Sequence, residues 1–312
     1  MARAYDTAPL RAIDLCCGAG GWACAARGTN LRIVLAVDLW DVCCRTYKLN
    51  HPGVDVTCGD LREPEVQRRI LDAASAAGVD VVLGAIPCQW LTRKRGKNFN
   101  PVGQDEKDRE RATLAAVLGL VEAIAPRYWC LEDVVGLAAE LPPGIPTLEL
   151  DSGNYSAQRR KRLYVGEFPR SVLTRGQCPR VMASELRPGP YRIGRRAADR
   201  KLSRAATFTA DTAYAASMAR KSPTICALGS RRDPDLVIVD PAIPGGRRQI
   251  EWQEAAGLQG FPADYVFYGS PTDVSLMVGQ AVQIDTARTI IEDICADAAA
   301  AGAAKLQAEK EA

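Results

Sequence analysis

A single cysteine stands where an apolar stretch of the chain gives way to a basic one. The segment "GAIPCQWLTRKRG" carries this residue, Cys88, and four cations follow it closely: Arg93, Lys94, Arg95 and Lys97. A thiol in this setting suits a small core residue, a metal ligand, or a nucleophile presented to a polyanion. Which of these it is depends on the other groups that the fold brings to it.

The cysteine and histidine content narrows these choices. The chain has eleven cysteines and one histidine, His51, and no CxxC pair or Cys/His cluster has the spacing of a zinc site. We therefore expect no metal. Catalysis by Cys–His or Ser–His–Asp would depend on His51 alone, which lies in "LNHPG" at a predicted helix end, so we disfavour it. In a chain without an export signal, the cysteines are expected to be reduced.

Length and charge set further limits. The 312 residues suffice for one large or two modest domains, and the net charge of +3 requires that any nucleic acid be met by a local basic patch. No apolar run approaches the roughly 20 residues that span a bilayer. The N-terminal "MARAYDTAPLR" has no apolar signal core. We expect a cytoplasmic protein without a membrane partner.

Strand and helix patterns alternate over the first 135 residues. Four short apolar runs predict strands: "RAIDL", "IVLAVD", "VDVVLGAI" and "RYWCLE". Helical patterns occupy 39–50, 64–77 and 111–125. This alternation predicts a parallel sheet with helices on both faces, whose ligands bind at the carboxyl ends of the strands. Cys88 follows the end of one strand, which favours the nucleophile over the core cysteine.

The composition changes at Phe168. Between Phe168 and Lys221 there are twelve Lys or Arg residues and three acids, with poor periodicity and frequent Gly, Pro and Ser. This stretch predicts a second, smaller, basic domain. The last residues, 285–312, have the apolar spacing of a helix and end in a charged tail.

A glycine-rich turn follows the first predicted strand in "IDLCCGAGG". Gly18, Gly20 and Gly21 allow the backbone to pass close to a ligand before a helix begins. Asp38 ends the next strand, where acidic residues of Rossmann-like sites accept hydrogen bonds from ribose hydroxyls, and Asp60 stands in the turn "CGDL". Three strand ends with suitable groups predict a nucleotide-like ligand at this edge.

Taken in order, the motifs resemble those of cytosine-5 methyltransferases, most closely the DNA-modifying members. They are "DLCCGAGG", "GAIPCQ", "LEDVVGL", "QRRKRLYVG", "RRQIEWQEAAGLQGFPADY" and "VGQAV", and they cover about 11–165 and 246–295. The resemblance implies an α/β, Rossmann-like S-adenosylmethionine-dependent methyltransferase domain with a smaller basic target-recognition domain. The first would comprise 1–167 plus 270–312 and the second 168–269.

The resemblance also implies the catalytic residues. Cys88 matches the nucleophile that attacks cytosine C6, and Glu132 matches the carboxyl that binds N3 and the exocyclic amine. Arg162 matches the arginine on the O2 side, and Gln158 and Arg160 complete that motif and are expected to brace the site.

The target base must leave the stacked duplex before a thiol can reach C6. Residues 89–105, with four cations and two glycines (Gly96 and Gly103), match the mobile loop that closes over the flipped base.

The implied cofactor is S-adenosylmethionine or a close derivative. The residues expected to bind it are Asp14, Gly18, Gly20, Gly21, Asp38, Leu39, Asp60, Leu61, Gln280 and Val282. Four positions depart from the family pattern: Cys16 replaces an aromatic, Leu39 a Trp, Asp133 an Asn, and Gln280 an Asn. We predict that Gln280 tunes the space around the transferred group, or accommodates a larger one.

The implied partner is double-stranded DNA, held by a monomer in the cleft between the two domains. The cytoplasm would be that of a bacterium, or of a host cell if the chain is viral. Four alternatives remain open: an enzyme acting on transfer RNA, one transferring a different group, a catalytically inactive DNA-binding relative, and a catalyst acting on a free nucleotide. The basic insert argues against the last, because a mononucleotide needs few cations.

Overall fold

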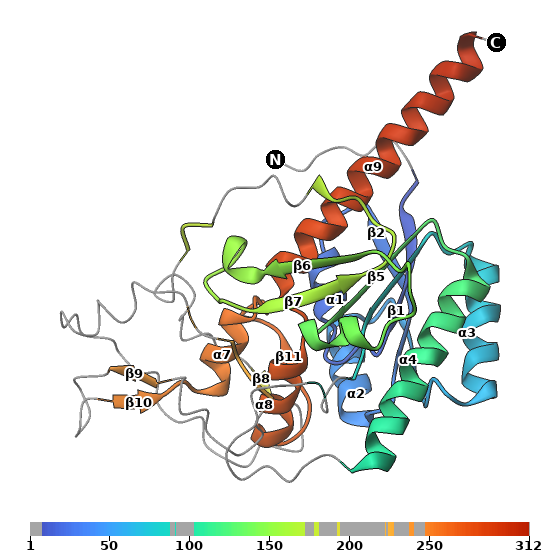
Figure 1. Ribbon diagram of the computed structural model, residues 1–312. Coiled ribbons are helices and arrows are strands. Elements are labelled where there is room, and N and C mark those ends of the chain that lie inside the picture. The colour runs from blue at the N-terminus through green and yellow to red at the C-terminus, as the bar shows by residue number, and fades with distance from the viewer. Residues whose placement is uncertain are drawn as a thin grey trace.

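A seven-stranded sheet forms the centre of the molecule in the order β3-β2-β1-β4-β5-β7-β6 (Figure 1). The computed structural model describes residues 8–87, 91, 103–171, 178–180, 192–193, 222, 224–227, 237–239 and 247–311. The strands of the sheet are β1 (Leu10–Leu15), β2 (Leu31–Asp38), β3 (Asp55–Cys58), β4 (Val81–Ala85), β5 (Tyr128–Asp133), β6 (Thr147–Asp151) and β7 (Lys161–Val165). Four short strands lie outside it: β8 (Arg192–Ile193), β9 (Val237–Val239), β10 (Arg247–Gln249) and β11 (Val266–Phe267).

Helices cover both faces of this sheet. They are α1 (Gly21–Ala26), α2 (Asp41–Asn50), α3 (Pro64–Ala77), α4 (Gln104–Ile124), α7 (Trp252–Leu258), α8 (Pro271–Gln280) and α9 (Ile284–Glu311), with short 3-10 turns η1 (Val135–Ala139) and η2 (Ser152–Asn154). One apolar core unites α1, α2, α8 and α9 with one face, and a second unites α3 and α4 with the other. Alternate residues of β1 enter the two cores, as expected of a central strand.

The amphipathic pattern of α3 illustrates how the sequence forms these layers. Pro64 occupies the first turn, where its missing N–H is not needed, and Gly78 ends the helix in the left-handed conformation with φ 63°. Val66, Ile70 and Ala74 recur at helical spacing and form its buried face.

All four strands predicted from the sequence are present, and five strands of the sheet are parallel, from β3 to β5. The parallel sheet predicted from the first 135 residues is confirmed, and the sheet continues beyond them with two antiparallel strands, because β7 runs antiparallel to β5 and β6 antiparallel to β7. Strand β3 was predicted only by its end, at the turn "CGDL", and not as an apolar run. It has only four residues and one buried side chain, so it lacks the apolar run of the others.

Helix α4 begins at Gln104, earlier than the predicted start at 111. The added turns are polar and largely exposed, so apolar periodicity does not reveal them, while Asp105 and Glu106 favour a helix N-terminus. Residues 104 and 105, expected in a mobile loop, are therefore helical. Of the rest of that loop only Leu91 and Gly103 are described, and 89–90 and 92–102 lie outside the described residues.

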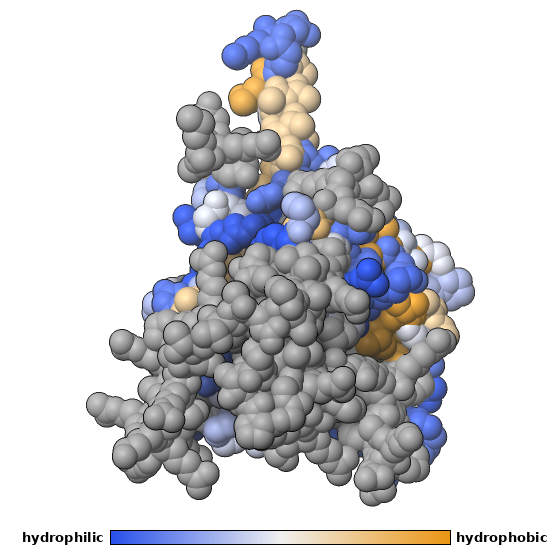
Figure 2. Space-filling view, turned by 90° about the vertical axis from the view of Figure 1, so that its left-hand side faces the viewer, coloured by the Kyte–Doolittle hydropathy of each residue, from blue (hydrophilic) through white to orange (hydrophobic). Residues whose placement is uncertain are grey.

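The C-terminal segment returns to the beginning of the chain. A Cβ on Gly21 would lie 2.7 Å from Val282 Cγ1, so only glycine allows α1 to approach this closely. Helix α9 continues the contact, and Arg288 Nη1 donates to the carbonyl of Arg27 at 2.8 Å. Beyond this contact α9 projects from the body, with an alanine-rich stretch and a hydrophilic tip (Figures 1 and 2).

Most of the stretch 168–269 predicted as a basic domain lies outside the described residues, so its boundaries stay a prediction. Its described end, 250–269, contributes Ala256, Phe261, Tyr265 and Phe267 to the core shared with α1, α8 and α9. Of the helices in the described part of the chain, none is long and apolar enough to cross a membrane.

A cluster of neutral side chains packs against the glycine turn between β1 and α1. His51 Nε2 lies 3.3 Å from Tyr265 Oη and 3.9 Å from Cys24 Sγ, and a Cβ on Gly20 would lie 2.9 Å from the same tyrosine oxygen. Burial and the nearby Arg27 lower the pKa of His51 to about 4, while burial raises that of Cys24 to about 12. An unactivated thiol and a neutral imidazole support the expectation that His51 is not part of a catalytic pair.

The low pKa of His51 predicts a loss of stability in acid. The unfolded chain binds a proton near the ordinary pKa of 6.5 and the folded protein only near 4, so this contribution is complete above 6.5 and is lost as the pH falls. Between pH 7 and 4.5 the wild type should lose about 2–3 kcal/mol more unfolding free energy than His51→Gln. Denaturant unfolding of both proteins at the two pH values measures this, and equal losses would contradict the assignment.

Helix α8 contacts the segment 224–227 at a glycine. A Cβ on Gly279 would overlap the backbone of Cys226 and Ala227, whereas a Cβ on Gly119, on the exposed side of α4, would meet no atom within 4 Å. The first site therefore excludes a side chain and the second does not.

Gly279→Ala should destabilise the protein by about 1–3 kcal/mol through overpacking. Gly119→Ala is the matched control and should stabilise it by up to about 1 kcal/mol through helix propensity. Thermal unfolding of both variants checks the pair, and a Gly279→Ala protein as stable as the wild type would refute the contact.

Candidate active site

The turn between β1 and α1 is held open by backbone geometry. Gly18 has φ 53° and Gly20 has φ 88°, both in the left-handed region that favours glycine. A Cβ on Gly18 would meet no atom within 4 Å, so this glycine faces open space, whereas Gly20 and Gly21 pack against Tyr265 and Val282. Of the three predicted glycines, Gly18 is thus the one that leaves room for a ligand.

Asp38 joins this turn to the next strand end. Its Oδ2 accepts from the N–H of Gly18 and its Oδ1 from the N–H of Trp40, each at 2.8 Å. Burial raises the pKa of Asp38, although these two hydrogen bonds oppose the rise. The carboxyl therefore fixes the position of the glycine turn relative to the turn after β2.

Asp14 supplies a second buried acid beside the first. Its Oδ2 accepts from Tyr47 Oη at 3.2 Å, and its Oδ1 has no hydrogen-bond partner among the described residues. Burial raises the pKa of Asp14 well above its usual range, and the charge of Asp38 adds to the rise. Two confined acids and an unpartnered oxygen, next to an open glycine turn, fit a ligand that carries positive charge, as S-adenosylmethionine does.

The other predicted cofactor residues that follow β2 and β3 differ in their contacts and in their exposure to solvent. Asp60, at the end of β3, pairs with Arg62, whose Nε lies 2.9 Å from its Oδ1, and this guanidinium lowers the pKa of Asp60. Leu61 is buried in the core of α3 and α4, while Leu39 is 64% exposed. Leu39 thus exposes an apolar side chain just after the end of β2.

The last two predicted cofactor residues come from the turn between α8 and α9. Val282 is buried against Gly21, as described above, and Gln280 is the exposed last residue of α8. The fold thus brings Val282 from the end of the chain to the glycine turn.

The predicted catalytic acid lies on β5, which β4 separates from β1. Glu132 is near the end of β5, and its Oε1 is 3.1 Å from Arg162 Nε on the antiparallel strand β7. The side chain of Glu132 is 5% exposed and that of Arg162 is 15% exposed, so the ion pair is almost dry. Antiparallel pairing of β5 and β7 places these two side chains together.

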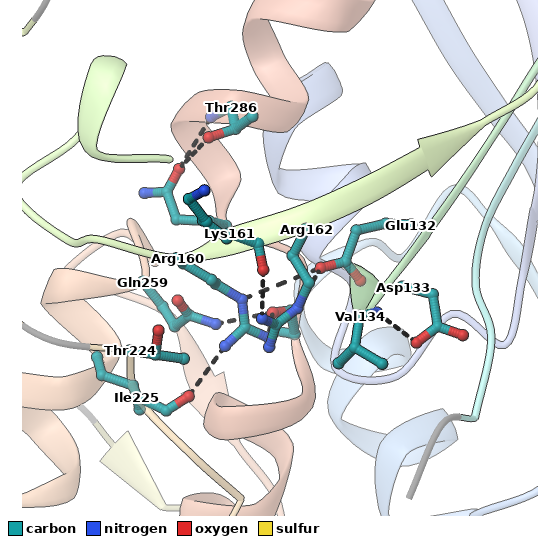
Figure 3. A network of polar contacts seen from close by, with 12 residues as sticks. Glu132, Asp133, Val134, Arg160, Lys161, Arg162, Thr224, Ile225, Gln259 and Thr286 are labelled. Carbon is teal, nitrogen blue, oxygen red and sulfur yellow. Dashed lines mark hydrogen bonds and ion pairs between the residues drawn. The ribbon is translucent and has the colours of Figure 1, made fainter. Parts of the chain in front are cut away.

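Arg160, also predicted as catalytic, has contacts that are largely structural. Its side chain is 2% exposed, and its Nη1 donates to the carbonyl of Ile225 at 2.9 Å (Figure 3). Its Nη2 donates to the carbonyls of Gly279 and Ala281, each at 3.1 Å, and its Nε is 4.0 Å from Glu132 Oε1. Burial lowers the pKa of Arg160 to about 10, so it remains charged at neutral pH. These contacts are those of a positioning residue.

A glutamine pair extends this network. Gln158 Nε2 donates to Gln259 Oε1 at 2.7 Å, and Gln259 Nε2 donates to the carbonyls of Val278 and Ala281 at 3.0 and 2.7 Å. Gln259 was not assigned a role from the sequence, although it stands in the motif "LQGFP". Only its position in a recognisable motif could have drawn attention to it, because an isolated glutamine gives no signal of burial.

Cys88 lies outside the described residues. The chain is described as far as Pro87, at the end of β4, where Ile86 N donates to the carbonyl of Glu132 at 3.3 Å. Among the described cysteines, burial raises the pKa of Cys16, Cys17, Cys43 and Cys130 well above the usual range, which makes them poor nucleophiles. No group of three or more His, Cys, Asp and Glu side chains that could hold a metal occurs in the described part of the chain.

Known proteins with similar sequences are methyltransferases. The Type II methyltransferase M.AgeI of Thalassovita gelatinovora is 33% identical over 130 residues, which are 41% of this chain and 28% of that protein. M.NgoMIV of Neisseria gonorrhoeae is 26% identical over 156 residues, 50% of this chain and 44% of that protein. The matched stretches therefore span less than half the length of these two relatives.

The fold has solved counterparts, and a family model matches the sequence. The Dnmt2 methyltransferase of S. pombe superposes with a TM-score of 0.66 at 14% identity, over 93% of this chain and 99% of that one. This likeness confirms the expected Rossmann-like methyltransferase fold. The model of the family described as C-5 cytosine-specific DNA methylase matches residues 10–141 and 191–296, well over half of the chain. The chain belongs to this family of C-5 cytosine-specific DNA methylases.

Proposed function

We propose that this protein is a DNA cytosine-5 methyltransferase that transfers a methyl group from S-adenosylmethionine to C5 of a flipped-out cytosine. The observation that carries the proposal is the dry ion pair between Glu132 and Arg162. It lies on β5 and β7, next to the end of β4 that leads to Cys88, at the same edge as the glycine turn. Family membership supports the reaction type.

The reaction assigns a separate task to each group. The Cys88 thiolate adds to C6 of the base, which breaks the aromatic ring and makes C5 nucleophilic. Glu132 binds N3 and the exocyclic amine as charge develops on the ring, and Arg162 orients Glu132 while binding the O2 side. After methyl transfer the C5 proton leaves to a base and the bond between Cys88 and C6 breaks, which restores the ring.

S-adenosylmethionine, when bound, supplies an electrophilic methyl group. Gly18 would allow its close approach to the backbone, Asp38 would bind the ribose, and Asp14 would face its positive charge. Leu39 would pack against the adenine in place of the usual aromatic side chain, and Asp60 would lie near the edge of that base.

DNA is the proposed substrate, although the chain's fold also suits an enzyme acting on transfer RNA. Two curated relatives are named Type II methyltransferases, which favours DNA. The twelve cations between 168 and 221 also favour a long polyanion, and we propose that this stretch chooses the recognition site.

A covalent trap tests both the nucleophile and the substrate. With S-adenosylmethionine, a duplex carrying 5-fluorocytosine should form an adduct that survives denaturing electrophoresis, because fluorine cannot leave C5 as a proton does. Cys88→Ser should form none but should still bind DNA, and the exposed-thiol control Cys58→Ser should form as much as the wild type.

Three results would contradict this assignment. They are trapping of a 5-fluorocytosine transfer RNA in preference to the duplex, trapping by Cys88→Ser, and methyl transfer by a wild-type protein that never traps the analogue.

Gln280 is expected to set the space around the transferred group. Arg160 binds the carbonyls of Gly279 and Ala281 on either side, so a substitution at 280 changes side-chain length without releasing the backbone. Gln280→Asn removes one methylene and should change the KM for S-adenosylmethionine several-fold. Steady-state kinetics measures this, and mass spectrometry of the modified nucleosides shows whether the group is methyl or larger. An unchanged KM, with 5-methylcytosine as the sole product, would reduce Gln280 to a neutral exchange.

A further inference from the structure

Two cysteine thiols contact the backbone of the turn that carries Asp38 and Leu39. Cys44 lies on α2 and Cys58 ends β3, and Cys44 Sγ lies 3.8 Å from the carbonyl oxygen of Thr57, the residue before Cys58. Cys44 is buried, whereas Cys58 is exposed. A buried and an exposed thiol packed against the same turn form a pair that a reagent in solvent can reach through Cys58.

Each thiol also contacts the backbone of this turn. Cys44 Sγ lies 3.5 Å from the carbonyl oxygen of Asp38, and Cys58 Sγ lies 3.6 Å from that of Leu39. Because Asp38 in turn binds the N–H groups of Gly18 and Trp40, a change at the thiols reaches the glycine turn through one residue. The thiol pair is therefore coupled to the edge where the adenosyl group is proposed to bind.

We propose that Cys44 and Cys58 are a redox modification site, which peroxide converts to a disulfide that weakens binding of S-adenosylmethionine. The effect on binding rests on the proposed function, whereas formation of the disulfide does not.

The chemistry balances with hydrogen peroxide as the oxidant. The exposed Cys58 sulfur attacks one peroxide oxygen, the O–O bond breaks, and the products are a sulfenic acid and one water. The Cys44 thiolate then attacks the Cys58 sulfur, which forms the S–S bond and releases the sulfenic oxygen as a second water. Two thiols lose two electrons and two protons in total, and one peroxide is reduced to two waters.

The surroundings of Cys44 fit the role of the second, resolving thiol. Burial raises its pKa, and the charges of Asp38 and Cys58 add to the rise while Lys48 opposes it. Cys44 is therefore protected from direct oxidation.

The disulfide changes the turn in two ways. Both thiol hydrogens are lost, so the contacts of the sulfurs with the carbonyls of Asp38 and Leu39 lose their donors. Forming an S–S bond of about 2.05 Å also draws α2 towards β3. Both changes displace the backbone that holds the carboxyl of Asp38.

The test oxidises the full-length protein with hydrogen peroxide, blocks remaining thiols with N-ethylmaleimide, and identifies cross-linked peptides by mass spectrometry. The wild type should yield a Cys44–Cys58 peptide, which dithiothreitol separates, and so should the control Cys43→Ser, whose cysteine is buried next to Cys44. Cys58→Ser, at an exposed position, should yield none.

Calorimetric titration with S-adenosylmethionine provides the second readout. Oxidised wild type should bind about tenfold more weakly than reduced protein, equivalent to 1.4 kcal/mol, with recovery in dithiothreitol and no loss for oxidised Cys58→Ser. The proposal is overturned if peroxide leaves both thiols open to alkylation, if another pair forms instead, or if the Cys44–Cys58 disulfide leaves affinity unchanged. A reduced wild type that binds no S-adenosylmethionine contradicts the proposed function, and the modification site is then judged by the cross-link alone.

Discussion

The buried guanidinium of Arg160 is the interaction on which the arrangement of the site depends. A charged group that is 2% exposed requires compensation, and Arg160 obtains it from three carbonyls on two segments far away in the sequence, at 225 and at 279 and 281. Loss of one partner from such a buried network typically costs about 3–5 kcal/mol. Strand β7 is thereby fixed to the turn between α8 and α9, which carries Gln280 and Val282. The proposed catalytic pair on β5 and β7 and the glycine turn are consequently held in fixed relative positions.

The charged side chains of the site differ between the ends of β1 and β2 and the strands β5 and β7. At the ends of β1 and β2, burial disfavours the anionic forms of Asp14 and Asp38 and raises their pKa values, and a nearby cation would offset this cost. At β5 and β7, two arginines surround a single carboxyl, Glu132, and this part favours an electron-rich ring that gains negative charge. The positively charged donor would thus lie near Asp14 and Asp38, and the base near Glu132. The strand end before Cys88 lies between the two.

The sequence predicted those features that depend on local pattern. The apolar runs of β1, β2, β4 and β5 and the glycines at 18, 20 and 21 were evident, because central strands and tight turns restrict residue type. It could not predict that Gly21 is required by Val282, or that Arg160 binds backbone carbonyls, because both facts depend on contacts across more than a hundred residues. The polar start of α4 was missed, and the short β3 was recognised only by the turn that follows it, because neither buries enough apolar surface to create a pattern. Cys88, the residue with the clearest motif, is the one whose surroundings the structure does not describe.

The central claim is that the methyl group replaces the hydrogen at C5 of cytosine in duplex DNA. Release of tritium from duplex DNA labelled at cytosine C5, measured together with incorporation of methyl groups from S-adenosylmethionine, tests it most directly. The account predicts that one tritium enters water for each methyl group incorporated, and that Cys88→Ser gives neither. Methyl incorporation without tritium release would place the new bond elsewhere on the base and contradict the account.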